Sequence, residues 1–175
     1  MESSMTGTNT QNLARLVAEN CLKLFADYNL EIHTAGPGES PDNAQFLLCG
    51  IIGFTSKRMR GSLVLATTGE PLARTNPIPA PSHRDWICEL ANQLLGRVKN
   101  QLLRRGIEIF ASTPIALRGD HVSPILQQRL VAELFIADRG VVCVWMDCEF
   151  DEGFELPEDA VCDVAPISEG QALLF

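Results

Sequence analysis

The sequence predicts an α+β sandwich in which two long helices lie on one antiparallel β-sheet. Residues 11–28 and 82–105 repeat apolar side chains at the spacing of an amphipathic helix. Short apolar segments follow each helix and are bounded by glycine, proline and basic residues, as expected for antiparallel strands joined by turns. Groups of strands that alternate with single helices are typical of α+β proteins, because each helix must bury its apolar stripe on the sheet.

Length and composition predict a single domain without a membrane-spanning segment. The chain has 175 residues, 46% hydrophobic and 21% charged, and a chain of this length buries about two-thirds of its unfolded surface. No apolar run reaches the roughly 18 residues that a membrane-spanning helix needs. The N-terminus also lacks a basic-then-apolar signal. We therefore expect a cytoplasmic protein.

Cysteine and histidine spacing predicts no cofactor held by the chain itself. The six cysteines form no Cys-x-x-Cys pair, and the three histidines stand far from any cluster of ligand residues. We expect neither a metal site nor a disulfide framework, and reduced cysteines agree with a cytosolic protein. The net charge of −8 argues against a nucleic-acid partner, which would favour a basic surface.

The two ends of the chain differ in composition from its middle. Residues 1–10 are rich in Ser, Thr and Asn, a composition typical of disorder. Residues 151–175 carry seven acidic side chains and no Lys or Arg. We therefore divide the chain into a disordered N-terminus (1–10), a folded domain (11–150) and an acidic C-terminal extension (151–175). The extension either solubilises the protein or docks through its apolar last residues.

A first group of strands lies between the two helices. Residues 31–35 predict a short strand, 46–54 a buried strand, and 61–66 the antiparallel partner that follows a basic turn. Gly50, within the buried strand, indicates a bulge or a close backbone approach. Residues 67–81 contain four prolines, which remove N–H donors and favour extended backbone, so we expect a loop there.

A second group of strands follows the second helix. Residues 107–111 and 115–118 predict strands on either side of a proline. Residues 130–137 and 141–150 predict a hairpin around a glycine-containing turn. The last strand is also a candidate edge strand. Its Trp145 would then cover an edge or take part in a subunit contact, or else it packs as an ordinary structural residue.

The helix predicted over residues 82–105 has clear start and stop signals. Ser82 is a good N-cap, and Asp85 three residues later completes a weaker, Asp-for-Glu version of a capping box. Gly106 follows two arginines, as a C-terminal glycine should. The helix is therefore defined by its own local sequence.

This helix has one apolar face and one polar line. The predicted buried stripe consists of Ile87, Leu90, Ala91, Leu94, Leu95, Val98 and Leu102. Asp85, Glu89, Asn92 and Gly96 follow one another down the opposite side. Glycine inside a helix costs about 1 kcal/mol relative to alanine and usually has a reason. Its lack of a side chain beside Asn92 would let another surface come close. A solvated face without function is the alternative, and we interpret the line as a contact face.

The same residues resemble the signature of the CheC/CheX/FliY chemotaxis phosphatases. Asp85, Glu89 and Asn92 reproduce the pattern Asp-x-x-x-Glu-x-x-Asn, and Gly96 extends it to Glu-x-x-Asn-x-x-x-Gly. Pro114 matches the proline that the family pattern expects, with 21 residues between it and Asn92. One copy of the motif is present, as in CheX-like rather than two-copy CheC-type proteins. The resemblance covers about residues 10–150 and implies a CheC-like pseudo-repeat fold. CheX-like proteins usually have more helix where residues 67–81 predict a loop.

The resemblance implies a phosphatase that acts on the phospho-aspartate of a response-regulator (CheY-like) receiver domain in chemotaxis or two-component signalling. The receiver would bring its own Mg²⁺ and lysine. Asn92 is then assigned to position the attacking water, and Glu89 to dock on the receiver's lysine. Asp85 would orient the start of the helix or the partner, with Gly96 in support. CheX-like relatives also imply a homodimer. The residues themselves offer no recognisable nucleophile, phosphate loop or metal site, so a self-contained phosphatase is not expected.

Two other interpretations remain open from the sequence. A CheC-like fold also serves as a non-catalytic binding or scaffold module, because fold does not determine function. An adaptor of that kind has no need of the Asn92 amide. A small-ligand sensor is the third interpretation, for which the sequence offers no specific polar pocket.

Overall fold

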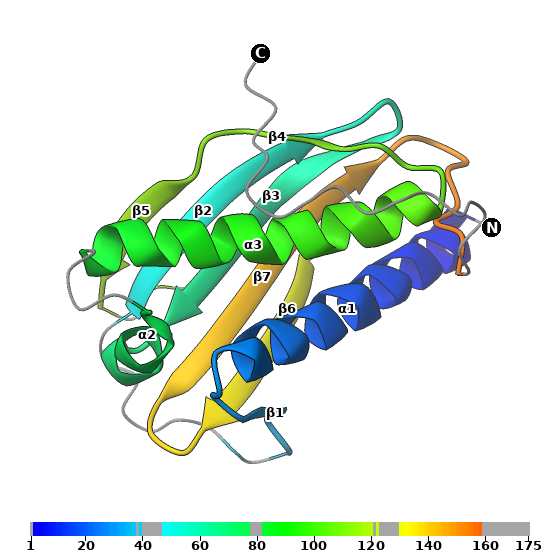
Figure 1. Cartoon of the computed structure of the whole chain (residues 1–175). Helices are drawn as coiled ribbons and strands as arrows, with labels where there is room; N and C mark the ends of the chain where they lie inside the picture. Colours follow the sequence, from blue (N-terminus) through cyan, green and yellow to red (C-terminus); the bar gives the residue numbers. More distant parts are fainter. Residues whose placement is uncertain are drawn as a thin grey trace.

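One antiparallel sheet with two long helices on one face makes up most of the described chain (Figure 1). The computed structural model describes residues 2–37, 39, 47–77, 82–120, 122 and 130–158. The helices are α1 (Glu2–Asp27), α2 (Gly69–Thr75) and α3 (His83–Arg104). The strands are β1 (Ile32–Thr34), β2 (Leu47–Thr55), β3 (Met59–Thr67), β4 (Phe110–Ala111), β5 (Ile115–Gly119), β6 (Leu130–Ala137) and β7 (Val141–Phe150). This arrangement confirms the predicted α+β fold.

The strand order of the sheet is β1-β6-β7-β3-β2-β4, and β5 also pairs with β2. Strands β4 and β5 pair with opposite ends of β2, so they lie one after the other along one margin of the sheet. Strand β7 pairs with both β3 and β6. The expectation that residues 141–150 form an edge strand is therefore wrong. Trp145 packs in a second apolar cluster with Cys49, Ala66 and Val141, which agrees with the structural role.

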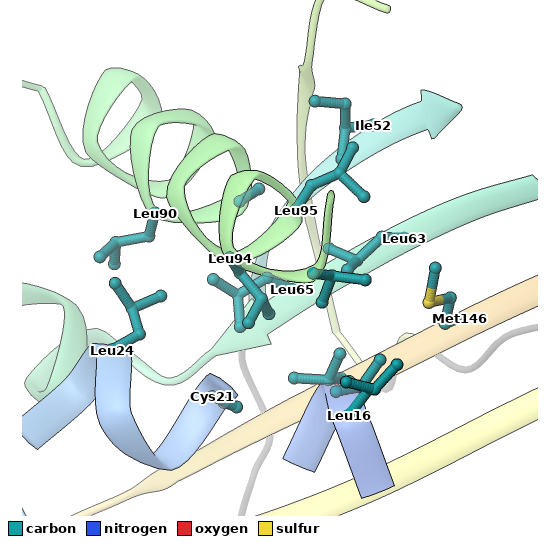
Figure 2. Close-up of a cluster of buried hydrophobic side chains, with 14 of the residues drawn as sticks. Leu16, Cys21, Leu24, Ile52, Leu63, Leu65, Leu90, Leu94, Leu95 and Met146 are labelled. Carbon is teal, nitrogen blue, oxygen red and sulfur yellow. The ribbon is translucent and has the colours of Figure 1, made fainter. Parts of the chain in front are cut away.

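The main core lies between the sheet and the helices α1 and α3. Figure 2 shows leucines of both helices meeting over Leu63 and Leu65 of β3. All seven residues of the predicted apolar stripe of α3 are buried, and none is more than 1% exposed. Helix α3 sits close to β2 at Gly50, where a Cβ would lie 2.6 Å from the Ile87 carbonyl oxygen and 2.9 Å from the Ala91 Cβ. This is the close backbone approach that the glycine indicated.

Two predicted irregular segments are helical in the structure. Residues 69–75 form α2, although a loop was expected over 67–81. Pro71 stands in the first turn of α2, where a backbone N–H has no acceptor within the helix, so the proline does not break it. Residues 78–81 lie outside the described residues. Helix α1 begins at Glu2 rather than at about residue 11, so the expected disorder of residues 1–10 is corrected for residues 2–10.

The start of the acidic C-terminal extension packs on the body of the protein. Asn9 donates from Nδ2 to the Phe154 carbonyl oxygen at 2.7 Å and accepts from the Leu156 N–H at 2.7 Å. Leu156 is 4% exposed and belongs to the main core. The packed chain therefore runs past residue 150, at which the folded domain was expected to end. Residues 159–175 lie outside the described ranges. No helix of the described chain is both long and apolar enough to cross a membrane.

Candidate functional site on helix α3

The start of α3 is capped as predicted. The Asp85 N–H donates to Ser82 Oγ at 3.2 Å, and the Ser82 hydroxyl donates to Asp85 Oδ2 at 2.6 Å. At the other end Gly106 has φ of 77°, and the Ile107 N–H donates to the Leu102 carbonyl oxygen. These caps give α3 defined ends. The polar line therefore lies on a helix whose start and end are both fixed by capping contacts.

The polar line of α3 faces away from the core. Asp85 and Asn92 are exposed, while Glu89 and Gly96 are half-buried. The Asn92 side chain makes no hydrogen bond to the described residues, so both its donor and its acceptor are available to a partner. A Cβ at Gly96 would meet no atom within 4 Å, so packing inside the described chain does not require glycine there. Glycine at this position instead leaves the surface beside Asn92 uncovered.

Glu89 is held by two residues that the sequence analysis did not single out. Gln93 donates from Nε2 to Glu89 Oε1 at 2.9 Å. The Tyr28 hydroxyl, just after the end of α1, donates to Gln93 Oε1 at 2.8 Å. The four-residue spacing of Glu89 and Gln93 places them side by side on a helix and could have revealed the first contact. The contact with Tyr28 depends on how α1 packs against α3, for which the sequence carries no local signal.

Trp86 connects this group to α2. Its ring meets the Tyr28 ring edge to face, with centroids 5.3 Å apart and planes at 89°. Its indole N–H donates to Thr75 Oγ1 at 3.0 Å. Trp86 is 7% exposed although it lies outside the predicted apolar stripe of α3. It is buried because Tyr28 and the last turn of α2 cover it. We call Thr75, Trp86, Tyr28 and Gln93 the Glu89 support chain.

The chemistry available at this surface is polar rather than nucleophilic. Burial raises the pKa of the Cys88 thiol, the nearby Arg84 lowers it and Asp85 raises it, with a net rise. A thiol with a raised pKa is a poor nucleophile at neutral pH, because the thiolate is the reactive form. The described residues include no group of three or more His, Cys, Asp or Glu side chains that could hold a metal ion. The site offers a carboxylate and an amide on one helix face.

An open pocket of about 660 Å³ lies on the sheet face away from the helices, and none of the four predicted site residues lines it. Its lining includes Arg60, Ser62, Asp147 and Glu149, and the Arg60–Glu149 ion pair spans 2.7 Å within it. The polar line of α3 and this pocket are separate features.

Several solved structures similar to this chain are of chemotaxis proteins. The sequence itself matches no protein-family model and no curated protein. The chemotaxis protein CheX of Vibrio vulnificus superposes with a TM-score of 0.66 at 17% identity, over 78% of this chain and 99% of that chain. A CheC-like chemotactic protein of Shewanella oneidensis MR-1 gives 0.64 at 21% identity, over 79% and 98%.

A third similar structure contains a partner. It is CheX in a CheX–CheY–BeF3–Mg²⁺ complex from Borrelia burgdorferi, with a TM-score of 0.55 at 14% identity over 75% of this chain and 96% of that chain. At these identities the similarity establishes the fold. The chain therefore has the fold of the CheX and CheC-like chemotaxis proteins. The resemblance that the sequence carries to CheC/CheX/FliY proteins is confirmed at this level.

Proposed function

We propose that this protein is a phosphatase that accelerates hydrolysis of the phospho-aspartate of a response-regulator (CheY-like) receiver domain. The observation that carries the proposal is the pair Glu89 and Asn92 on the outer face of α3. The Asn92 amide is exposed and makes no hydrogen bond to the described residues, while Glu89 is held by Gln93. The CheX-type fold adds support, because one structure of this fold is a complex with CheY.

Asn92 has the right chemistry to position the attacking water. An amide side chain can accept one hydrogen bond and donate two, so a single asparagine orients a water molecule in a defined direction. Alignment of the water with the breaking bond is the main requirement in phosphoryl transfer, where catalysis is mostly positioning and charge stabilisation. The Mg²⁺ expected on the receiver supplies the charge stabilisation when bound. This chain therefore needs no metal or nucleophile of its own.

Glu89 is assigned to docking. Its carboxylate lies one helical turn before Asn92 and accepts from Gln93 through Oε1. A carboxylate can pair with the active-site lysine of a receiver, and this contact would set the distance between Asn92 and the phosphoryl group. Asp85 supports the start of the helix through its contacts with Ser82. Gly96 leaves space for the receiver surface.

A second copy of the protein is also a proposed partner, and it would bind at β4 and β5. The exposed large hydrophobic side chains of the described residues are Phe110, Ile115 and Leu117, at 40%, 68% and 46% exposure. All three lie on β4 and β5, and the described part of the chain pairs these strands only with β2. An exposed apolar strand at the margin of a sheet favours pairing with another strand. We therefore place the proposed homodimer contact at β5. A CheY-like receiver as partner would place the proposed reaction in the cytoplasm.

The experiment follows phosphate release from a CheY-like receiver of the same genome, phosphorylated with acetyl phosphate. We expect the parent protein to shorten the lifetime of the phospho-aspartate and Asn92→Ala to lose this acceleration while its melting temperature stays unchanged. Loss of one positioning group costs about 2.7–4 kcal/mol of transition-state stabilisation, or roughly 100- to 1000-fold in rate. An Asn92→Ala protein as active as the parent rules out this mechanism. A parent that binds the receiver without shortening the lifetime supports the scaffold alternative.

A further inference from the structure

The Glu89 support chain has a single consistent direction of hydrogen bonding. The Glu89 carboxylate can only accept, so Gln93 must present its amide nitrogen to it, as the 2.9 Å contact has it. The carbonyl oxygen of Gln93 then faces Tyr28, whose hydroxyl donates at 2.8 Å. Each group has one role, and no alternative orientation of the Gln93 amide satisfies both contacts. Gln93 is therefore held from both ends.

The end of the Glu89 support chain that lies farthest from Glu89 is buried and is held by α2. Trp86 and Thr75 are 7% and 1% exposed. The Thr75 hydroxyl lies 2.9 Å from the Pro71 carbonyl oxygen and accepts from the Trp86 indole N–H at 3.0 Å. The orientation of the Trp86 ring in turn limits where the Tyr28 ring can lie. The support chain thus joins α2 and the end of α1 to one side chain on the outer face of α3.

This arrangement uses one of the two carboxylate oxygens of Glu89. Gln93 engages Oε1, and no described residue donates to Oε2. A glutamate on an exposed helix face otherwise samples several rotamers, and ordering them on binding weakens association. A glutamate that is already oriented by an internal hydrogen bond avoids part of that cost. Its second oxygen stays available to a cation on a partner.

We propose that Gln93 and Tyr28 are positioning residues that orient Glu89 for docking on the receiver. This inference rests on the proposed function, because it assigns the Glu89 contact to the receiver's lysine. It extends the site from α3 alone to the junction of three helices. It also gives α2 a part in the site, because Thr75 of α2 holds the indole that limits the position of Tyr28.

The test is Tyr28→Phe, which removes the hydroxyl and keeps the ring that packs on Trp86. We expect KM for the phosphorylated CheY-like receiver to rise about fivefold, equivalent to about 1 kcal/mol of docking free energy, with kcat at saturation unchanged. The matched control is Asp27→Asn. It breaks the Asp27–Arg97 ion pair of 2.7 Å between the same two helices, one residue from Tyr28 and outside the support chain. The control should leave KM unchanged.

A second measurement tests the Glu89 support chain in the absence of the receiver. Hydrogen exchange of the Gln93 side-chain amide, measured by NMR on the free protein, should be faster in Tyr28→Phe than in the parent and the control, because the hydroxyl that holds the Gln93 carbonyl oxygen is lost. Faster exchange with an unchanged KM overturns the inference and leaves the docking role of Glu89 intact. A purely structural role of the Tyr28 hydroxyl would lower the melting temperature of Tyr28→Phe without raising KM, which also overturns the inference.

Failure of the proposed function gives a different pattern. If the parent does not shorten the phospho-aspartate lifetime, docking is measured as the Kd for the same receiver loaded with beryllofluoride and Mg²⁺. A Kd raised about fivefold by Tyr28→Phe alone then supports the positioning role in a non-catalytic complex. An unchanged Kd overturns it. A parent that neither binds nor dephosphorylates the receiver overturns the proposed function and the inference together.

Discussion

Replacing Glu89 tests whether the carboxylate on α3 docks the receiver or acts in the chemical step. Two variants separate charge from size. Glu89→Gln keeps the length of the side chain and an oxygen that can accept from Gln93. Glu89→Ala removes both the charge and the internal contact. If docking depends on the charge, both variants weaken association and neither changes the rate at saturation.

The expected magnitude follows from the position of the carboxylate. A hydrogen bond to a charged group contributes about 1.5–3 kcal/mol when desolvated. Glu89 is half-buried in the free protein, so water already screens part of its charge, and we lower the expected contribution to values at and just below the low end of that range. About 1–2 kcal/mol corresponds to a rise in KM of about 5- to 30-fold. The internal contact with Gln93 is lost only in Glu89→Ala, which should be the weaker binder.

The assay measures phosphate release over a range of concentrations of the phosphorylated receiver, so that KM and kcat are obtained separately. If Glu89 acts in docking, both variants should reach the kcat of the parent when the phosphorylated receiver is saturating. Higher ionic strength should weaken binding of the parent more than that of Glu89→Gln, because salt screens the charge that the variant lacks. A kcat that stays low at saturation, with KM unchanged, would show that Glu89 acts in the chemical step and would refute the docking assignment.

Three further outcomes are expected. Gly96→Ala should stabilise the protein by about 0.5–1 kcal/mol, because the new Cβ meets no atom within 4 Å. It should still raise KM for the receiver, because the Cβ fills space on the contact face, and higher thermal stability with unchanged KM would exclude Gly96 from that face. Gly50→Ala should destabilise by about 1–3 kcal/mol in urea unfolding, because its Cβ would lie 2.6 Å from the Ile87 carbonyl oxygen, whereas parent-like stability would contradict the close approach of α3. Leu117→Glu should convert the proposed dimer to a monomer in light scattering with little loss of stability, since Leu117 is 46% exposed; a dimer that persists would remove β5 from the contact.

Most of the candidate site could be predicted because it lies on one helix. The N-cap at Ser82, the buried stripe and the polar line from Asp85 to Gly96 depend on residues within a few turns of one another, and the structure confirms each of these positions. The assignment of roles to Glu89 and Asn92 came from the resemblance and remains a proposal. Gln93 was overlooked although its spacing from Glu89 is that of a helix contact.

The remaining differences arise where a distant segment decides the outcome. Pro-rich composition predicted a loop, but Pro71 falls in the first turn of α2, and Thr75 at the end of that helix contacts Trp86 of α3. Strand β7 lies inside the sheet because β3 and β6 both pair with it. The sequence shows that this strand has an apolar face and does not show how many neighbours it has.

The sequence by itself determined the two long helices, the strand pairs joined by short turns, and the acid–amide line opposite the apolar stripe of α3. These features follow from capping, periodicity and turn chemistry, which act over a few residues. Only the tertiary structure decided the order of the strands, the packing of residues 154–156 against Asn9, and the support chain from Thr75 through Trp86 and Tyr28 to Gln93. Such contacts join residues far apart in the chain. Their geometry is set by packing around a shared core, which no local pattern encodes.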